Sequence, residues 1–450
     1  MTPRALLLVA TTAAALLPAA SAAADAPWQA FSPSDVAGGQ SLVTSAGNAV
    51  FLPEPYISFR HRAPNGGVVT TVNASGKITA RRQLTLKAPM AQTFGGDGLL
   101  IYGEKTKAGT PLMIGQAAGG AFATRTLPAS AGRVVSLAAN AAGDVAAVGG
   151  TASTDDSVNS DGPQAHSVWL LRHGQQHFRK VLTFSGKNAA FNASVSVAPA
   201  GGLLLAWQPN NGTFSLRIMV RRSTASGVWR APQALSNYGY GSLGISSATD
   251  NRGRATVVWR GGWVGGVSYG CGPLQLASAA AGKPFTAPQT VEPEVENCTA
   301  GFAMVQTPSN GALLAWPSTT EDLHAVVKAT SVVDGAAQPA QQLSRSDTYD
   351  SPGIVNAAVG PNNEAVVTWT TYTRDAGTCL VDSLRRDGAD ASFGGVEQLS
   401  CDYDQKSWYS HGLGFDGKTQ RPIATYAGDK GGARVSVRSE SGSPTPVPSP

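Results

Sequence analysis

Aromatic and acidic residues gather in several segments between the apolar runs of the chain, and they are the side chains best suited to chemistry. Tyrosine offers apolar area with a polar tip, and carboxylates accept hydrogen bonds from hydroxyl groups, so together they suit sugars or extended polymers. The alternative is that these side chains pack the segments against one another and bind nothing. The candidate ligand-binding residues are Tyr238, Tyr240, Trp263, Tyr269, Glu294, Tyr349, Arg374, Asp404, Trp408 and His411.

The four cysteines are a second candidate for chemistry: Cys271, Cys298, Cys379 and Cys401. A metal site or a catalytic thiol needs close neighbours, and the chain has no CxxC motif and no histidine beside a cysteine. We therefore expect disulfides, with no metal site and no cofactor. Four cysteines allow three pairings.

A repeated strand pattern must position these residues. A small and apolar run at Leu243–Ala248, a polar turn with glycine and a β-branched run at Ala255–Trp259 have the chemistry of a β-hairpin. A further apolar strand and an edge strand complete the unit, as at Ser215–Arg222 and at Trp229–Leu235, where Pro232 removes a ladder donor. Similar hairpins begin at Ser194, Phe302, Val355 and His411, with weaker copies at Ser41, Met90 and Val134. Four strands per unit predict a propeller blade.

The expected fold is all-β: a β-propeller of eight four-stranded blades, with seven blades as the alternative if one weak early repeat is misread. The last unit supplies three strands, at His411–Asp416, Pro422–Tyr426 and Ala433–Arg438, and no edge strand follows them. Near the other end, Trp28–Ser32 resembles the edge strands inside the chain. We therefore expect the N-terminal strand to pair with the last blade and close the ring.

Propeller topology assigns the segments that contain the candidate residues to one face of the ring. The loops from second to third strand and from one blade to the next leave on one face, which we call the upper face. All ten candidate residues, together with Glu292, fall in such loops, whereas the turns on the opposite face are short. Cys271 and Cys379 follow second strands, and Cys298 and Cys401 lie in connections that leave the same blades. This equivalence favours Cys271–Cys298 and Cys379–Cys401 disulfides.

Four tryptophans have a different role, because they recur at one position of the repeat. Each ends a second strand: Trp207, Trp259, Trp316 and Trp369. Residues that a repeat holds in place usually fill the space between blades, so we expect these four in the core.

The N-terminus has the composition of a secretory signal peptide. Arg4 supplies the charge, Ala5–Leu17 the apolar core, and small residues up to Ala24 the cleavage region. The apolar run is shorter than the roughly 20 residues that span a bilayer. We expect secretion and no membrane span, with a signal peptide at 1–24, a single propeller domain at 25–440 and a Ser/Pro-rich tail at 441–450.

The charge of the chain predicts no nucleic-acid partner. The formal net charge of +5 is small and is interpreted as evenly spread, with no clustered basic stripe. The pairs Arg81-Arg82, Arg221-Arg222 and Arg385-Arg386 are assigned to solvated outer strands of separate blades. We expect a monomer.

The repeat, with its edge strand WRAPQALS, resembles secreted bacterial propellers of the sialidase-like superfamily. The resemblance covers nearly all of the chain after the signal peptide and concerns architecture and repeat texture. Sialidases carry Asp boxes of the form Ser-x-Asp-x-Gly-x-x-Trp, and this chain has no intact copy. They also use three arginines, a Tyr/Glu pair and an acid, but no motif assigns such roles to Arg60, Arg62, Arg260 or Arg374.

The expected function is binding of a glycan or of another extracellular macromolecule, such as a protein, at the upper face. No catalytic residue is assigned, so enzymatic activity stays undecided, with binding favoured. The alternatives are a sialidase-like exo-glycosidase and a non-catalytic scaffold associated with the cell envelope.

Overall fold

Antiparallel strands make up nearly all the regular structure of the chain, as shown by a computed structural model. It describes residues 28–31, 40–52, 67–87, 89–150, 166–184, 190–209, 217–236, 242–261, 272–293, 301–320, 325–344, 351–373, 377–385, 392–394, 396–402, 411–427 and 433–438. In these ranges the one helical element is a 3-10 turn, η1 (Ala129–Ala131). No helix among them has the length and apolarity needed to cross a bilayer.

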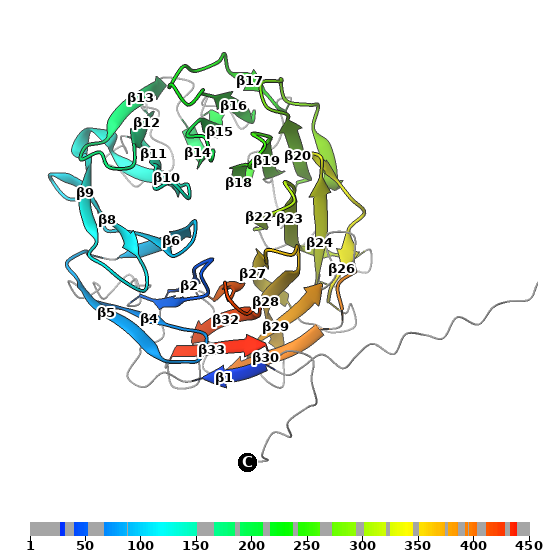
Figure 1. Cartoon of the computed structure of the whole chain (residues 1–450). Coiled ribbons are helices and arrows are strands. Elements are labelled where there is room, and N and C mark those ends of the chain that lie inside the picture. Colours follow the sequence, from blue (N-terminus) through cyan, green and yellow to red (C-terminus); the bar gives the residue numbers. More distant parts are fainter. Residues whose placement is uncertain are drawn as a thin grey trace, which may run out of the picture.

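Consecutive strands pair into sheets that follow one another around a ring (Figure 1). The first four sheets along the chain contain β2 (Ser41–Val43), β3 (Ala49–Phe51), β4 (Gly67–Val72) and β5 (Ile78–Leu84); β6 (Met90–Phe94), β7 (Gly98–Tyr102), β8 (Gly109–Gln116) and β9 (Ala123–Pro128); β10 (Arg133–Ala139), β11 (Val145–Gly150), β12 (His166–Leu171) and β13 (Arg179–Phe184); β14 (Ala190–Val197), β15 (Leu203–Pro209), β16 (Met219–Arg222) and β17 (Gln233–Ala234).

The remaining sheets complete the ring. They contain β18 (Ser242–Thr249), β19 (Ala255–Gly261), β20 (Leu274–Ala279) and β21 (Gln289–Glu292); β22 (Ala303–Gln306), β23 (Ala312–Thr319), β24 (Ala325–Val333), β25 (Ala336–Ala337) and β26 (Gln341–Gln342); β27 (Ser351–Val359), β28 (Ala365–Thr373), β29 (Gly377–Arg385) and β30 (Val396–Asp402); and β31 (Gly412–Phe415), β32 (Pro422–Ala427), β33 (Ala433–Arg438) and β1 (Trp28–Phe31). In the β22–β26 sheet the short strands β25 and β26 both pair with β24. The chain is therefore an all-β propeller built from four-stranded sheets, one of which carries an extra short strand.

The last sheet contains both ends of the described chain. Strand β1 pairs antiparallel with β33, from Trp28 opposite Arg438 to Phe31 opposite Val435. Strand β33 in turn pairs with β32, and β32 with β31. The expected pairing of the N-terminal strand with the last unit is confirmed, and it covers the outer edge of β33 and brings the last sheet to four strands.

Four of the turns between first and second strands share one backbone conformation. Gly201 and Gly253 adopt φ of +85° and +76°, and Asn310 and Asn363 adopt φ of +64° and +63° at the equivalent position. Each donates its backbone N–H to the carbonyl three residues earlier, for example Gly201 to Ala198 at 2.8 Å. Glycine and asparagine tolerate this left-handed conformation, so the repeated Gly/Asn signal of the sequence corresponds to a tight hairpin turn.

The core lies between neighbouring sheets and includes the repeated tryptophans. Trp207, Trp259, Trp316 and Trp369 are each the fifth residue of a second strand, β15, β19, β23 and β28, rather than its last residue as expected, and their exposed fractions are 6%, 3%, 0% and 2%. Each packs with aliphatic residues of its own sheet and of an adjacent one. Their expected core position is confirmed.

A recurring glutamine in the outer strands links neighbouring sheets. The Gln233 amide donates to the Phe285 carbonyl at 3.0 Å and accepts from the Phe285 N–H at 3.0 Å. Gln289 makes the same pair of bonds with Ala337, and Gln341 makes it with Phe393. We call these three reciprocal contacts the glutamine clasps. They explain the glutamine of the edge-strand motif, because its amide mimics a backbone group and continues the hydrogen bonding into the next sheet.

Two details differ from the expectation. The edge strand at Trp229–Leu235 is ordered as a β-strand only over β17, Gln233–Ala234, since it follows Pro232, which has no N–H to donate. The pair Arg221-Arg222 belongs to β16, a third strand rather than an outer one, and Arg385 ends β29, which is also a third strand. The proposed signal peptide and the Ser/Pro-rich tail lie outside the described residues.

Candidate functional site

The candidate ligand-binding residues follow strand ends that share one face of the ring. Strands alternate in direction within each sheet, so the ends of second and fourth strands lie on the same side. The described strands that precede the candidates are β17, β19, β21, β26, β28 and β30, all second or outer strands. Nine of the candidates lie outside the described residues: Tyr238, Tyr240, Trp263, Tyr269, Glu294, Tyr349, Arg374, Asp404 and Trp408.

His411 lies within the described residues, directly before β31, and it is buried, with 5% of its surface exposed. Its carbonyl accepts a hydrogen bond from Asn356 Nδ2 of β27 at 2.7 Å, and its imidazole hydrogen bonds to the backbone of Thr368 in β28. Nε2 has no hydrogen-bond partner. The ring therefore lies against the neighbouring β27–β30 sheet rather than in solvent, and a ligand would need a change in packing to reach it.

Burial sets the protonation state of this histidine. Desolvation lowers the pKa of His411 to about 4, and the hydrogen bond to Thr368 acts weakly in the opposite direction. The imidazole is accordingly neutral at pH 7. A neutral, enclosed imidazole suits the sheet interface and is poorly placed to contact an anionic ligand.

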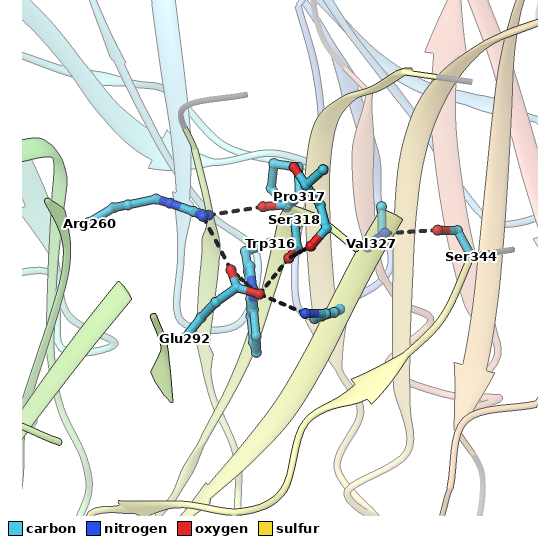
Figure 2. Close-up of polar contacts among 9 residues, drawn as sticks. Arg260, Glu292, Trp316, Pro317, Ser318, Val327 and Ser344 are labelled. Atoms are coloured by element: carbon cyan, nitrogen blue, oxygen red, sulfur yellow. Dashed lines mark hydrogen bonds and ion pairs between the residues drawn. The ribbon is translucent and has the colours of Figure 1, made fainter. Parts of the chain in front are cut away.

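A buried polar cluster lies where two candidate segments begin. It comprises Arg260, Glu292, Trp316, Ser318 and Lys328, and we call it the Glu292 cluster. Figure 2 shows the Glu292 carboxylate between the β18–β21 sheet, which supplies Arg260, and the β22–β26 sheet, which supplies Trp316 and Ser318. The segments with Trp263 and Glu294 begin directly after Arg260–Gly261 and Glu292–Pro293.

Four donors surround the Glu292 carboxylate. Oε2 accepts from the Trp316 indole N–H at 2.6 Å and from the Arg260 guanidinium at 3.2 Å. Oε1 accepts from the Ser318 hydroxyl and from Lys328 Nζ, the latter at 2.9 Å. The second terminal nitrogen of Arg260 donates to the Pro317 carbonyl at 2.9 Å.

The cluster is charged and almost closed to water. Arg260 is fully buried and the Glu292 side chain is 3% exposed, while Lys328 retains 27% exposure. Burial lowers the pKa of Arg260, and the adjacent Glu292 charge raises it; a guanidinium titrates so far above neutrality that it stays protonated. One Arg260 nitrogen, Nε, has no partner. Two cations therefore face a single carboxylate.

This arrangement is structural chemistry rather than catalysis. Because the carboxylate already accepts four hydrogen bonds, it has no free lone pair for a substrate proton or a ligand hydroxyl. The assignment of Glu292 to a loop surface is wrong, because Glu292 ends a strand and is buried. Arg260 likewise cannot bind the carboxylate of a substrate in this packing. The cluster joins two sheets at the point where two candidate segments leave them.

Sequence reasoning missed the cluster as a unit, although one signal was present. Lys328 is the one charged residue of the mostly buried strand Ala325–Val333. A charged residue in a strand buried on both faces requires a partner of opposite charge, so this lysine predicts a carboxylate nearby. Nothing in the chain order indicates that the partner comes from the preceding sheet.

The cysteines are described only in part. Cys379 in β29 and Cys401 in β30 lie directly opposite each other in the antiparallel register. Residues opposed in this way have Cα atoms about 4.5–5.5 Å apart, within the span that a disulfide bridges. Cys271 and Cys298 lie outside the described residues. Across the part of the chain that is described, no three His, Cys, Asp or Glu residues converge on a possible metal position.

Comparisons with known proteins found only distant structural neighbours. No family model matches the chain, and no curated protein matches it. A solved prolyl endopeptidase is 10% identical with a TM-score of 0.47, and the alignment covers 87% of this chain but 54% of that one. The β-propeller domain of the trilobed protease from Pyrococcus furiosus, which has an open velcro topology, is 11% identical with a TM-score of 0.44, over 78% of this chain and 96% of that one.

A polysaccharide lyase, Uly1, is 10% identical with a TM-score of 0.42, over 92% of this chain and 99% of the lyase. The chain thus spans about half the length of the peptidase, at 54%, and nearly all of the lyase. All three TM-scores are below 0.5, so the propeller assignment rests on the strand pairing of this chain. The sialidase-like resemblance of the sequence stays a prediction.

Proposed function

We propose that the protein is a secreted propeller whose upper-face loops bind a glycan or another extracellular macromolecule. The observation that carries the proposal is topological: every strand that precedes a candidate residue ends on the same side of the ring. Loops held side by side by a rigid scaffold are the usual location of binding residues. The aromatic and acidic composition of these segments in the sequence favours hydroxyl-rich ligands.

The Glu292 cluster supports this proposal because it lies at the strand ends from which two candidate segments begin. It fixes the ends of β19 and β21 against β23 and β24 through buried bonds. A site whose supporting residues are locked can hold ligand contacts with little reorganisation. The cluster therefore supplies a firm base for the segments that carry Trp263 and Glu294.

Two finer features belong to the same proposal. We propose that each sheet is one blade of an eight-bladed propeller; the assignment of the described strands to seven four-stranded sheets and one five-stranded sheet supports this count. Disulfides join Cys379 to Cys401 and Cys271 to Cys298. The register of β29 and β30 supports the first pair, and peptide mapping of the non-reduced protein tests both.

A glycan array tests the binding function. The protein lacking residues 1–24 is compared with a triple variant, Tyr240→Ala, Trp263→Ala and Trp408→Ala. The expected result is loss of array binding by at least tenfold with an unchanged unfolding midpoint. A control triple variant, Val228→Ala, Asn251→Ala and Lys418→Ala, changes residues outside these loops and should bind as the parent does. Unchanged binding by the first variant would favour the scaffold interpretation.

The same samples test the glycosidase alternative. Aryl glycosides are incubated with the parent protein and with Glu294→Gln and Asp404→Asn variants. We expect no turnover. Hydrolysis that either substitution abolishes would overturn the binding proposal in favour of an enzyme.

A further inference from the structure

The charge of the chain is divided unevenly along its sequence. Residues 1–290 contain 23 Lys and Arg against 10 Asp and Glu, whereas residues 291–450 contain 11 against 19. The small net charge of +5 therefore hides a strongly basic part and an acidic part. The sequence-based interpretation of an evenly spread charge is wrong, because net charge cannot report this separation.

Six of the basic residues of the first part lie on or next to outer strands. Strands β5, β9 and β13 lie on the perimeter of the ring in that order, and β17 continues it (Figure 1). Their cations, with one that precedes β17, form what we call the basic rim: Arg81, Arg82, Arg125, Arg179, Lys180 and Arg230. All six are exposed or half-exposed. The described carboxylates between residues 67 and 290 lie in turns, at Asp97, Glu104, Asp144 and Asp250.

Hydrogen bonding holds several rim guanidinium groups without neutralising them. Arg82 donates to the Gln116 carbonyl at 2.7 Å, Arg125 to the Gln175 carbonyl at 3.1 Å and Arg230 to the Gly282 carbonyl at 2.6 Å. A carbonyl dipole orients the planar group and leaves its positive charge in place. These bonds also reach the following sheet, so the charges are fixed at the junctions between sheets.

Two rim positions come together at one such junction. The carbonyl that Arg125 contacts belongs to Gln175, four residues before Arg179 and five before Lys180. Charges from the β6–β9 and β10–β13 sheets therefore lie along one line of the perimeter. Like charges gathered at one surface repel one another, and a polyanion relieves that repulsion by binding there.

From these observations we propose that the basic rim is a second binding surface, separate from the upper face, which binds an anionic polysaccharide carrying carboxylate or sulfate groups. Such a polymer can follow successive outer strands and meet a fixed cation at each junction. The local aromatic rings argue against a nucleic acid partner. Arg82 lies 4.6 Å from the Phe122 ring centroid, and Lys180 Nζ lies 5.6 Å from that of Trp169. These cations cover the rings that stacking on bases would require.

Retention on immobilised heparin and polygalacturonate at increasing NaCl tests the proposal, with dextran as the neutral control. The parent protein should be retained by both polyanions at 0.1 M NaCl and not by dextran. The rim variant is Arg125→Gln with Arg179→Gln and Lys180→Gln. It should lose at least tenfold in affinity and reduce the slope of log affinity against log salt by about one per charge removed.

A charge-matched variant controls for net charge alone. Lys105→Gln, Lys107→Gln and Lys418→Gln remove the same charge from exposed turn positions off the rim and should reduce affinity less than threefold. Equal losses in the two variants, or no retention of the parent protein, would overturn the proposal. Tighter binding of duplex DNA than of either polysaccharide would replace the polysaccharide with a nucleic acid. Array binding at the upper face should be the same in the rim variant, so this inference and the proposed function can fail independently.

Discussion

The Glu292 cluster and the His411 site both bury an ionisable side chain, and they differ in whether that side chain stays charged. Both place an ionisable side chain between neighbouring sheets, near strand ends of the same face. In the cluster, the carboxylate keeps its charge because two cations and two neutral donors surround it. At His411 burial dominates, Nε2 is unpartnered, and the imidazole is neutral at pH 7.

The difference shows what decides whether a buried group stays charged. A carboxylate moved out of water loses solvation that only several close donors can replace, and Glu292 has four. A lone imidazole can instead remain neutral, at a cost that appears only when the solution becomes acidic. The first site should therefore respond most to mutation, and the second to pH.

The largest expected effect is that of Glu292→Ala, which leaves Arg260 buried without a counter-charge. Loss of one member of a buried ion pair costs about 3–5 kcal/mol, so the free energy of unfolding should fall by about that amount. Urea denaturation at pH 7 measures it. The control is Glu104→Ala, which removes an exposed carboxylate and should change stability by less than about 0.5 kcal/mol. A loss under 1 kcal/mol for Glu292→Ala would contradict the account of a coupled buried cluster.

The next effect is the pH dependence that His411 imposes. Its folded-state pKa of about 4 lies below the ordinary value of 6.5. Protons therefore bind the unfolded chain first, and stability falls as the pH drops from 6.5 towards 4, with no further loss from this group below the folded pKa. The shift corresponds to about 3 kcal/mol.

Comparison of parent and His411→Leu stability between pH 8 and pH 4 isolates this contribution. The variant should lose less stability on acidification than the parent does, since its position cannot bind a proton in either state. His177→Leu removes an exposed histidine and should keep the parent profile. Parallel curves for the parent and His411→Leu would show that the imidazole is not buried in solution.

A smaller effect is expected at the glutamine clasps, which are neutral polar contacts between sheets. Gln341→Ala removes two hydrogen bonds to Phe393, each with a net value of about 1 kcal/mol, so the loss should be about 2 kcal/mol. Gln342→Ala is the matched control, because its amide contacts only Ser344 in the same sheet. Equal destabilisation by the two variants would show that the clasp contributes nothing beyond a surface hydrogen bond.

The smallest expected effect has the opposite sign. Thr368 is fully buried beside His411 and its hydroxyl has no hydrogen-bond partner. Thr368→Val removes that hydroxyl and leaves the backbone bond to the imidazole, so stability should rise by up to about 1 kcal/mol. Thermal denaturation checks the sign. A decrease would mean that the hydroxyl is satisfied in solution.

Much of the fold could be predicted because its signals are local. The Gly/Asn turns, the alternating strands and the tryptophan that recurs in four second strands need only neighbouring residues to be recognised. Even the closing strand was visible, since Trp28 to Ser32 repeats the edge-strand motif. The limits of β17 were less predictable, because one proline shortens the ladder by an amount that depends on the partner strand.

The candidate site was predicted only in part. Composition and position within the repeat together pointed to the loop residues and to the disulfide pairs. The burial of Arg260, Glu292 and His411 was not predicted, because it depends on how neighbouring sheets pack. The separation of basic and acidic parts was missed because a single net charge averages over both parts of the chain.

The sequence by itself determined the repeat, the all-β class and the strand that closes the ring, because each depends on the pattern of apolar and turn residues along the chain. Only the tertiary structure decided which polar groups are enclosed and what partners they have. Glu292 meets its donors across a boundary between two sheets, and Arg125 reaches the carbonyl of a following sheet. Such contacts join residues far apart in sequence, and their free energy depends on desolvation, which exists only once the sheets have packed.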